Sequence, residues 1–480
     1  MNKYLGDALH TDLYQINMGY AYFKDGVHER KSYFDVYFRK IPFGGGYAVF
    51  AGLAKIIDYL NSFEFSNSDI EFLRELGYEE DFLEYLSAMK FTGSIRSVKE
   101  GEIIFANEPL LRIEAPLIQA QIMETAILNI VNYQILIATK AARIKHLCPD
   151  EVCMEFGTRR AHEFDAAIWG TRASIVGGFD ATSNVKAAKL FNIPCSGTHA
   201  HSFVQAYEDE EVAFKKYAAA HKDCYFLVDT YDTLRSGIPT AIKVADELKD
   251  KINFHGIRLD SGDIAYLSKE ARKMLDEAGY PNAKIVASND LDEDTITHLK
   301  QEGACIDAWG VGTKLITAFD NPALGAVYKL SCLENDNGEM IDRLKVSENP
   351  AKLTVPGVKR VYRIINIDTG MAAGDYIALE NEDVNAEQSI KLFHPTHTYL
   401  AKEVENFKAI DIHEDIFVNG KQVYEVPTVQ ESAKYFQQNK ELLWSEYLRL
   451  LNPEFYPVDL STKCWENRKE ILERVTKKSK

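Results

Sequence analysis

The sequence has few cysteines, and none of them stand in pairs. They are an odd number, seven, and no two have the CxxC spacing of a metal or redox site; they are Cys148, Cys153, Cys195, Cys224, Cys305, Cys332 and Cys464. Neither a disulfide framework nor a zinc site is therefore expected. Scattered thiols suit a reducing compartment, so we expect a cytoplasmic protein.

Positive charge is also scarce. The chain has 55 Lys and Arg against 72 Asp and Glu, which gives a formal net charge of −17. The average field around such a protein repels a phosphate backbone, so nucleic-acid binding is not expected. Any anionic ligand would need cations that are concentrated locally.

Long apolar runs are absent as well. The most apolar stretch, Leu117–Ala138, is interrupted by Gln, Glu and Asn side chains that a lipid-facing helix would not carry at that density. We predict a buried amphipathic helix there and no membrane partner. The first fifteen residues mix charged and apolar side chains where a signal peptide needs a continuous apolar run, so no export is expected.

What the sequence does have is enough apolar material for two or three domains. It has 480 residues, of which 46% are hydrophobic. Strand-like runs occur at Ser32–Arg39, over 93–113 and again after Gly312. Between them, short apolar runs alternate with helical segments such as Ile238–Lys249 and Asp263–Ala278. That alternation is typical of a parallel α/β barrel or a layered sheet.

The segment from Phe156 to Tyr207 concentrates groups that recognise anions. It holds the FGTRR motif, a Gly-Gly bend and the turn GTHAHS within about fifty residues. Arginine binds phosphate or carboxylate in bidentate fashion, and bare glycine backbone lets a ligand approach main-chain N–H groups. The segment predicts an anion site beside a reactive histidine.

Two acidic residues end apolar runs, where barrel strands carry their chemistry. Asp229, in LVDTYDT, and Asp260, in IRLDSGD, each follow directly on an apolar run, so both carboxylates are expected at one barrel mouth. The alternative is that they only cap helices or form turns, the role we expect for Asp232 and Asp263. Arg258 lies two residues before Asp260, hence on the same strand face, as a ligand group or as a structural ion pair.

These motifs, in this order, resemble those of the nicotinate phosphoribosyltransferases, within the wider family that includes the nicotinamide and quinolinate enzymes. The resemblance runs over nearly the whole chain, through TDLYQINM, FDVYFRKIPFGGGY, FGTRRA, GTHAHS, VDTYDT, GIRLDSGD, GVGT and LTVPGVKRVYR. It implies an irregular TIM-like α/β barrel at 125–319 and a strand-rich α+β domain. We assign that second domain to 1–124, completed by about 320–382, with 383–480 as a C-terminal appendage.

The resemblance implies an enzyme that joins nicotinate to the ribose 5-phosphate of phosphoribosyl pyrophosphate, with ATP hydrolysis coupled to the step. The products are nicotinate mononucleotide and pyrophosphate, in NAD salvage. Mg²⁺ is expected to be carried mainly by pyrophosphate, with Asp229 and Asp260 as candidate ligands. A homodimer with shared active sites is also implied, in which Tyr14 and Arg39 complete the neighbouring subunit's site.

The resemblance also assigns residues to the substrates. Arg258 matches the position that binds the nicotinate carboxylate, and Tyr14 the tyrosine that stacks on the pyridine ring; the alternative for Tyr14 is an ordinary core tyrosine. Arg39 and Arg159 match phosphate-binding positions, whereas Arg160 and Arg172 are expected to be solvated at the surface. Backbone N–H groups of the GVGT turn would cradle the 5-phosphate, unless it is a common glycine turn; its candidates are Gly310, Gly312 and Thr313.

The histidine of the coupling step is the sharpest assignment. In GTHAHS the position that matches the family phosphohistidine is His201, not His199. Neutral imidazole is a good nucleophile near neutral pH, although a turn histidine bonded to backbone is the commoner case. Many relatives have Glu after this histidine and this chain has Ser202, so the part played by that carboxylate is open.

Substrate choice depends on one turn. Ser183 aligns with an aspartate of the nicotinamide-using relatives, and a neutral serine favours an acid substrate over an amide. If the alignment is off, Asp180 or Asn184 takes that place. The alternatives are a nicotinamide phosphoribosyltransferase, or a non-catalytic metabolite-binding protein of the same fold.

Overall fold

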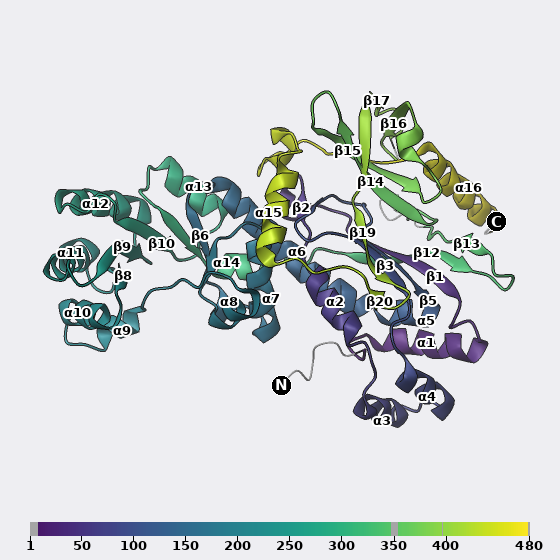
Figure 1. Cartoon of the computed structure of the whole chain (residues 1–480), viewed down its shortest axis with the longest axis horizontal. Helices are drawn as coiled ribbons and strands as arrows, with labels where there is room; N and C mark the ends of the chain where they lie inside the picture. The colour runs from purple at the N-terminus through teal and green to yellow at the C-terminus, as the bar shows by residue number, and fades with distance from the viewer. Residues whose placement is uncertain (1–7, 347–353, 396, 479–480) are drawn as a thin grey trace. The chain divides into compact units, whose positions relative to one another are not determined.

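A computed structural model describes residues 8–346, 354–395 and 397–478; Leu353, which opens the LTVPGVKRVYR motif, lies outside these ranges. The chain forms two compact units (Figure 1). The strand-rich unit contains residues 1–136 and 323–480, and the half-barrel unit contains residues 137–322. The predicted α/β class, with a parallel barrel-like sheet and a strand-rich part, is confirmed.

The half-barrel unit is built on a parallel sheet of six strands, with β7 and β8 as its edges. The strand order is β7 (Ala181–Thr182), β6 (Val152–Glu155), β11 (Ala308–Val311), β10 (Lys284–Ser288), β9 (Asn253–Leu259) and β8 (Asp223–Leu227). Its helices are α7 (Glu163–Val176), α8 (Val185–Phe191), α9 (His201–Gln205), α10 (Glu210–Ala220), α11 (Ile238–Glu247), α12 (Ile264–Glu277), α13 (Glu293–Gln301) and α14 (Thr313–Ile316).

Local sequence explains where these helices begin. The Asp263 carboxylate accepts from the Tyr266 N–H at 3.0 Å and caps α12, and Asp232 accepts from the Arg235 N–H at 2.9 Å and caps the helical turn Thr233–Gly237 that leads into α11. Both caps were predicted, because an aspartate at this position bonds an N–H group that has no partner within the helix. Helices α10, α11 and α12 pack against β8, β9 and β10 (Figure 1).

The strand-rich unit has a seven-stranded antiparallel sheet. Its order is β13 (Met340–Asp342), β12 (Val327–Glu334), β1 (Lys31–Tyr37), β5 (Leu111–Pro116), β3 (Ser94–Val98), β19 (His413–Val418) and β20 (Lys421–Gln422). Strand β1 is central, paired with β12 and β5, and every residue after Lys31 in it is buried. Segments from both ends of the chain therefore share one sheet.

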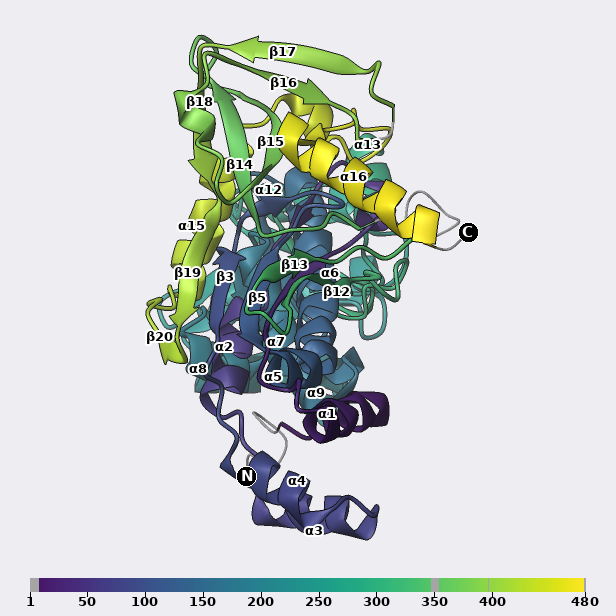
Figure 2. The same ribbon diagram turned by 90° about the vertical axis from the view of Figure 1, so that its right-hand side faces the viewer.

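A second sheet has the order β18 (Phe407–Asp411), β14 (Lys359–Asn366), β15 (Ala372–Leu379) and β21 (Val458–Leu460). Residues 383–480, expected as an appendage, thus supply strands to both sheets. Two pairs complete the strands, β2 (Ala48–Val49) with β4 (Ile103–Ile104) and β16 (Ser389–Phe393) with β17 (Ala401–Glu405). The unit's helices include α1 (Leu13–Asp25), α2 (Leu53–Asn61), α15 (Val429–Lys440), α16 (Thr462–Lys478) and the adjoining α3 (Asn67–Glu75) and α4 (Glu80–Ala88), which project together in Figure 2.

The stretch predicted as one helix forms two, α5 (Leu117–Ile122) and α6 (Glu124–Leu147), interrupted at Met123. The Thr11 hydroxyl donates to the Ile122 carbonyl at 2.9 Å, and Gln15 donates to the Glu124 carboxylate at 3.0 Å. Side chains on α1 and just before it thus provide hydrogen-bond partners for the Ile122 carbonyl and the Glu124 carboxylate at the break. Among the described residues, no helix combines the length and apolar character that crossing a bilayer requires.

A buried arginine joins the second sheet to the β2–β4 pair. The side chain of Arg363, on β14, is 2% exposed and binds Asp375 at 2.8 and 3.0 Å, together with Glu102. The Tyr456 hydroxyl donates to the same Asp375 at 2.8 Å, and its ring stacks on Phe105 at 3.7 Å. Each buried charge is therefore paired and hydrogen-bonded, as its desolvation demands.

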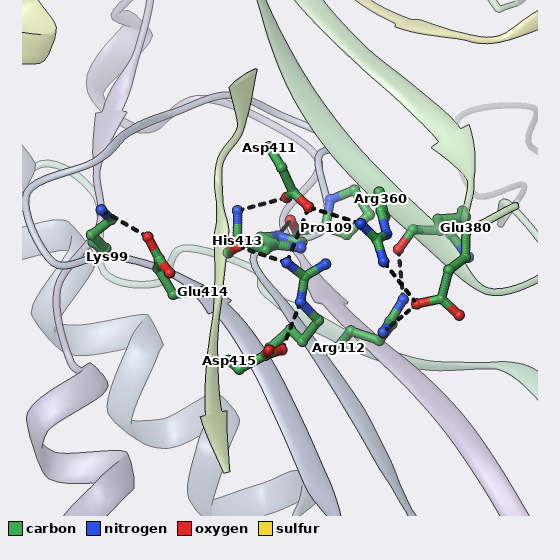
Figure 3. Close-up of polar contacts among 11 residues, drawn as sticks. Lys99, Pro109, Arg112, Arg360, Glu380, Asp411, His413, Glu414 and Asp415 are labelled. Carbon is green, nitrogen blue, oxygen red and sulfur yellow. Dashed lines mark hydrogen bonds and ion pairs between the residues drawn. The ribbon is translucent and has the colours of Figure 1, made fainter. Parts of the chain in front are cut away.

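Ion pairs connect the two large sheets (Figure 3). Arg112 on β5 donates to Glu380 at 2.8 Å and to the Lys359 carbonyl at 3.0 Å. Beside them, the buried His413 ring bonds the Pro109 carbonyl through Nε2 at 2.8 Å, while its Nδ1 has no partner among the described residues. Burial lowers the pKa of His413 to about 4, although Asp411 opposes the shift.

This histidine should make stability fall in mild acid. An unfolded histidine titrates near pH 6.5, so the contribution of neutral His413 is fully present above that pH and is lost as the pH falls toward 4. Between pH 7 and 4 we expect the unfolding free energy, measured with urea, to drop by about 2–3 kcal/mol more in the parent than in His413→Gln. The exposed His10→Gln is the control, and equal slopes in parent and His413→Gln would contradict the assignment.

Candidate active site

Three neighbouring strands deliver polar side chains to one edge of the parallel sheet. Strands β8, β9 and β10 run parallel, and Asp229, Asp260 and Ser288 lie at or just beyond their carboxyl ends. The predicted meeting of the two aspartates is seen directly, since the Asp260 N–H donates to Asp229 Oδ2 at 3.0 Å. The carboxyl edge of such a sheet is where barrel enzymes place their chemistry.

Arg258 is held by its neighbours on this edge. Its Nη2 donates to Asp260 Oδ1 at 2.6 Å, its Nε to the Ser288 hydroxyl at 2.8 Å, and its Nη1 to the Thr198 hydroxyl at 3.3 Å. The guanidinium also lies over the Phe156 ring, 5.6 Å from its centroid. Arg258 thus forms the structural ion pair with Asp260, and its side chain remains partly exposed. Its role as a ligand group stays a prediction.

The charge state of Asp260 follows from these contacts. Burial by itself raises the pKa of this carboxyl, but the hydrogen bond from Ser288 and the charge of Arg258 outweigh it, and the net shift is downward. Asp260 is therefore a carboxylate at neutral pH. An anion fixed beside a cation lets the site meet both signs of charge on a substrate.

Asp229 has one carboxylate oxygen to spare. Its Oδ2 accepts from Asp260 N and from the Ser261 hydroxyl at 2.6 Å. Its Oδ1 is buried and has no partner among the described residues. A buried carboxylate oxygen without a donor fits a hydroxyl or a cation of a bound substrate. No group of three or more His, Cys, Asp and Glu suited to a metal ion occurs in the described ranges.

The two histidines of GTHAHS have different environments. His199 is buried against Phe214 and Tyr217, its Nε2 accepts from the Leu227 N–H at 3.2 Å, and burial lowers its pKa to about 4. His201 is 37% exposed; its Nδ1 lies 3.1 Å from the Thr230 hydroxyl and its Nε2 lies 3.7 Å from Asp260 Oδ2. His201 is the histidine that reaches the carboxylates.

The FGTRR turn is anchored by Glu155, which sequence reasoning did not single out. This buried carboxyl accepts from Gly157 N, from the Thr171 hydroxyl at 2.8 Å and from the Thr182 hydroxyl at 2.7 Å. Burial raises the pKa of Glu155 despite these bonds. The turn holds Arg159 exposed on the surface, where an arginine can meet a phosphate.

Arg172 differs from the prediction. It was expected to be solvated, but it is 3% exposed and lies over the Phe191 ring, 5.7 Å from its centroid. The reason is that α7 is buried continuously from Ala167 to Val176, so even its polar positions face protein.

Of the three candidates for the substrate-selecting position, two have structural tasks. The Asp180 carboxylate accepts from Cys153 N and binds Lys145, and Asn184 caps α8 by accepting from Ala187 N. Ser183 is half-buried, and among the described residues its hydroxyl makes only a long contact of 3.5 Å, to the Glu155 carbonyl. Its hydroxyl therefore remains the most available of the three.

The GVGT turn is tightly packed at its first glycine. A Cβ on Gly310 would lie 2.5 Å from the ring of Phe156, the side chain beneath Arg258. Gly312 precedes the four-residue α14, and Thr313 begins it. A phosphate cradle at Gly310, Gly312 and Thr313 stays a prediction, and packing alone already explains the first glycine.

The two remaining candidates belong to the strand-rich unit. Tyr14 on α1 is 51% exposed, so it is not the core tyrosine that was the alternative. Arg39 lies over the Tyr37 ring, and its buried Nε has no partner among the described residues. Sequence reasoning missed Lys329 on β12. Burial lowers its pKa; the charge of Glu124 opposes the shift, and those of Arg39 and Lys345 add to it. The signal was a lysine between Tyr328 and Leu330 in a strand-like run.

Comparisons with known proteins point to one family over nearly the whole length of this chain. Models of the nicotinate phosphoribosyltransferase N-terminal domain, family and C-terminal domain match residues 9–132, 152–347 and 358–468. The chain is 62% identical to nicotinate phosphoribosyltransferase of Bacillus subtilis, covering 98% of this chain and 96% of that one. It is 35% identical to the Caenorhabditis elegans protein of the same name, covering 96% and 92%.

A solved structure is similar as well. The crystal structure of human nicotinic acid phosphoribosyltransferase superposes with a TM-score of 0.86 at 28% identity. The match covers 96% of this chain and 99% of the human one.

The packing role of Gly310 can be tested by adding one methyl group. Gly310→Ala should push Phe156 away from its place under Arg258 and cost about 1–3 kcal/mol of unfolding free energy in urea. Gly197→Ala is the matched control, because nothing lies within 4 Å of a Cβ built there. Unchanged stability of Gly310→Ala, with weaker binding of phosphoribosyl pyrophosphate, would favour a phosphate contact instead.

Proposed function

Because this chain belongs to the nicotinate phosphoribosyltransferase family, we propose that it forms nicotinate mononucleotide and pyrophosphate from nicotinate and phosphoribosyl pyrophosphate, as a step of NAD salvage. The observation that carries the proposal is that Arg258, Asp260 and Asp229 are hydrogen-bonded to one another at the carboxyl edge of the parallel sheet. The chain that holds them matches a family member over 98% of its length. Membership of the family suggests the reaction, and the side chains at this sheet edge have the charges that the reaction needs.

Arg258 would bind the nicotinate carboxylate. Its guanidinium is half-buried, fixed on two sides by Ser288 and Asp260, and thus presents its outer N–H groups in a set direction. A carboxylate matches such a planar fork of donors. Held in this way, the pyridine nitrogen is the free end of the substrate and is the atom that attacks the sugar.

The two carboxylates would act on the ribose. As the bond from C1′ to the pyrophosphate oxygen breaks and the bond from C1′ to the ring nitrogen forms, positive charge develops on the sugar. Asp229 Oδ1, which is buried and receives no hydrogen bond from the described part of the chain, and the ionised Asp260 would stabilise that charge or bind the ribose hydroxyls. Pyrophosphate leaves with the electron pair of the broken bond.

Cations would hold the phosphates. Arg159 is exposed beside the FGTRR turn, and Arg39 forms a positive group with Lys329 in the strand-rich unit. Mg²⁺, when bound, neutralises pyrophosphate charge, and Asp229 and Asp260 are the carboxylates suited to hold it.

We further propose a homodimer in which Tyr14 and Arg39 complete a partner's site. Sedimentation of the full chain tests the dimer. We also propose a cytoplasmic location.

ATP would be coupled to the transfer through His201. Its exposed ring lies between the Thr230 hydroxyl and Asp260, whereas His199 is buried and used in packing. A neutral imidazole fixed by a hydroxyl at one nitrogen is a suitable phosphoryl acceptor. The residue that follows is Ser202, so no carboxylate stands at that position to orient the ring.

The acid substrate is favoured over the amide. The position aligned with the aspartate of nicotinamide-using relatives is the neutral Ser183, which would not repel a carboxylate. A nicotinamide phosphoribosyltransferase is the nearest alternative, and a non-catalytic protein of this fold is the other. Measuring mononucleotide formation from nicotinate and from nicotinamide, each with and without ATP, separates the three.

Removing the proposed carboxylate contact should affect nicotinate selectively. We expect Arg258→Gln to raise the apparent nicotinate constant about ten- to hundredfold, the loss of one charged hydrogen-bonding group of roughly 1.5–3 kcal/mol. The constant for phosphoribosyl pyrophosphate should change less. Arg160→Gln, which removes an exposed arginine from the half-barrel unit, is the control. An unchanged nicotinate constant in Arg258→Gln would remove this residue from the nicotinate site.

The coupling role of His201 predicts a covalent phosphoenzyme. With radiolabelled ATP, the parent should acquire an acid-labile, base-stable phosphate that is absent from His201→Ala. This variant should keep some ATP-independent transfer, because Asp229, Asp260 and Arg258 remain. Label on His199, or unchanged ATP hydrolysis by His201→Ala, would show that the assignment is wrong.

A further inference from the structure

The strand-rich unit contains a cavity of about 300 Å³. None of the residues proposed above to bind substrates or phosphates or to couple ATP lines it. It lies between the end of β1, the loop after β4, strands β15 and β21, and helix α16. Its apolar wall is formed by Ile41, Phe105, Ile377, Val458 and Leu460. A volume of this size is at the lower end of the range for small-molecule sites.

One side of the cavity carries an arginine without a carboxylate partner. Arg468 on α16 is half-buried, and its Nη2 donates to the Pro395 carbonyl at 2.7 Å. No salt bridge joins it to an Asp or Glu of the described residues. Burial lowers its pKa, and the opposing effect comes from Cys464 rather than from an acidic side chain. In a chain with 72 acidic residues, burying half of an arginine that has no carboxylate partner in the described part of the chain is costly.

A buried hydroxyl and a histidine line the same space. The Tyr37 hydroxyl is buried without a hydrogen-bond partner among the described residues, and Arg39 lies over its ring. The His394 Nδ1 accepts from the His397 N–H at 2.9 Å, so a neutral His394 carries its proton on Nε2. Burial lowers the pKa of His394, which favours that neutral form. The acidic residue in the lining, Glu454, is exposed.

We propose that this cavity binds a small anion that carries a flat ring, of the size of a mononucleotide, with its phosphate or carboxylate at Arg468. The guanidinium, which has no carboxylate partner among the described residues, and the Tyr37 hydroxyl supply donors for an anion, and the acidic residue of the lining, Glu454, is exposed. The apolar wall suits a ring and would gain nothing from a bare inorganic ion. The cavity floor is rigid, because the stacked Phe105 and Tyr456 rings rest on the Arg363–Asp375 pair.

The test uses the full chain and adenosine 5′-monophosphate, a probe that joins a ring to a phosphate. Hydrogen exchange with mass spectrometry should show protection of segments 453–460 and 464–470 when the probe is bound. Titration calorimetry should give an affinity that Arg468→Gln weakens about tenfold or more, the loss of a charged contact. Arg468→Lys should keep most of it. Inorganic phosphate should bind much more weakly.

Arg474→Gln is the matched control, because it removes the same charge from an exposed position of α16. Equal affinities in Arg468→Gln and Arg474→Gln, or no protection of these segments at millimolar probe, would overturn the proposal. Equal binding of inorganic phosphate would contradict the role of the apolar wall. Asp260→Ala should lose the transfer reaction and keep the protection, so the proposed function and this inference fail separately.

Discussion

The charge of Arg258 has to be balanced at the carboxyl edge of the parallel sheet, and the rest of the candidate site is organised around that need. Asp260 provides the negative charge at 2.6 Å, Ser288 bonds both members of the pair, and Asp229 takes the Asp260 N–H. Each contact comes from a different strand end. The site can therefore exist only when β8, β9 and β10 are in register, which ties its chemistry to the sheet beneath it.

Neighbouring residues in this site have clearly separated tasks. His199 and His201 are two positions apart, yet one is a buried acceptor with a lowered pKa and the other is exposed beside Asp260. Phe156 has two packing roles. Its ring lies beneath Arg258, and it fills the space that a side chain at Gly310 would need. Replacing His199 or Phe156 would therefore shift His201 or Arg258, although neither of these side chains is itself changed.

Much of this arrangement could be predicted from the sequence. Asp229 and Asp260 end apolar runs and Arg258 has period-2 spacing from Asp260, so local rules sufficed to bring them together. The burial of Arg172, the helix break at Met123 and the anchoring by Glu155 could not be predicted in this way. They depend on partners far along the chain, such as Thr11 at Ile122, which no periodicity in a single segment reveals. The residues from 383 on gave no sign of the strands with which they would pair, for the same reason.

The pairing of β1 with β12 has a consequence for how the protein is made. Ser32 pairs with Leu333, so a nascent chain leaving the ribosome exposes one edge of its first long strand while the whole half-barrel unit is still being translated. At roughly 5–20 residues per second, the 210 residues between Pro116 and Val327 take about 10–40 s to synthesise. During that interval an apolar central strand lacks its neighbour, which is when unpaired edges aggregate. The inserted unit is continuous in sequence and can fold in the meantime, whereas the first unit has to wait for the last third of the message.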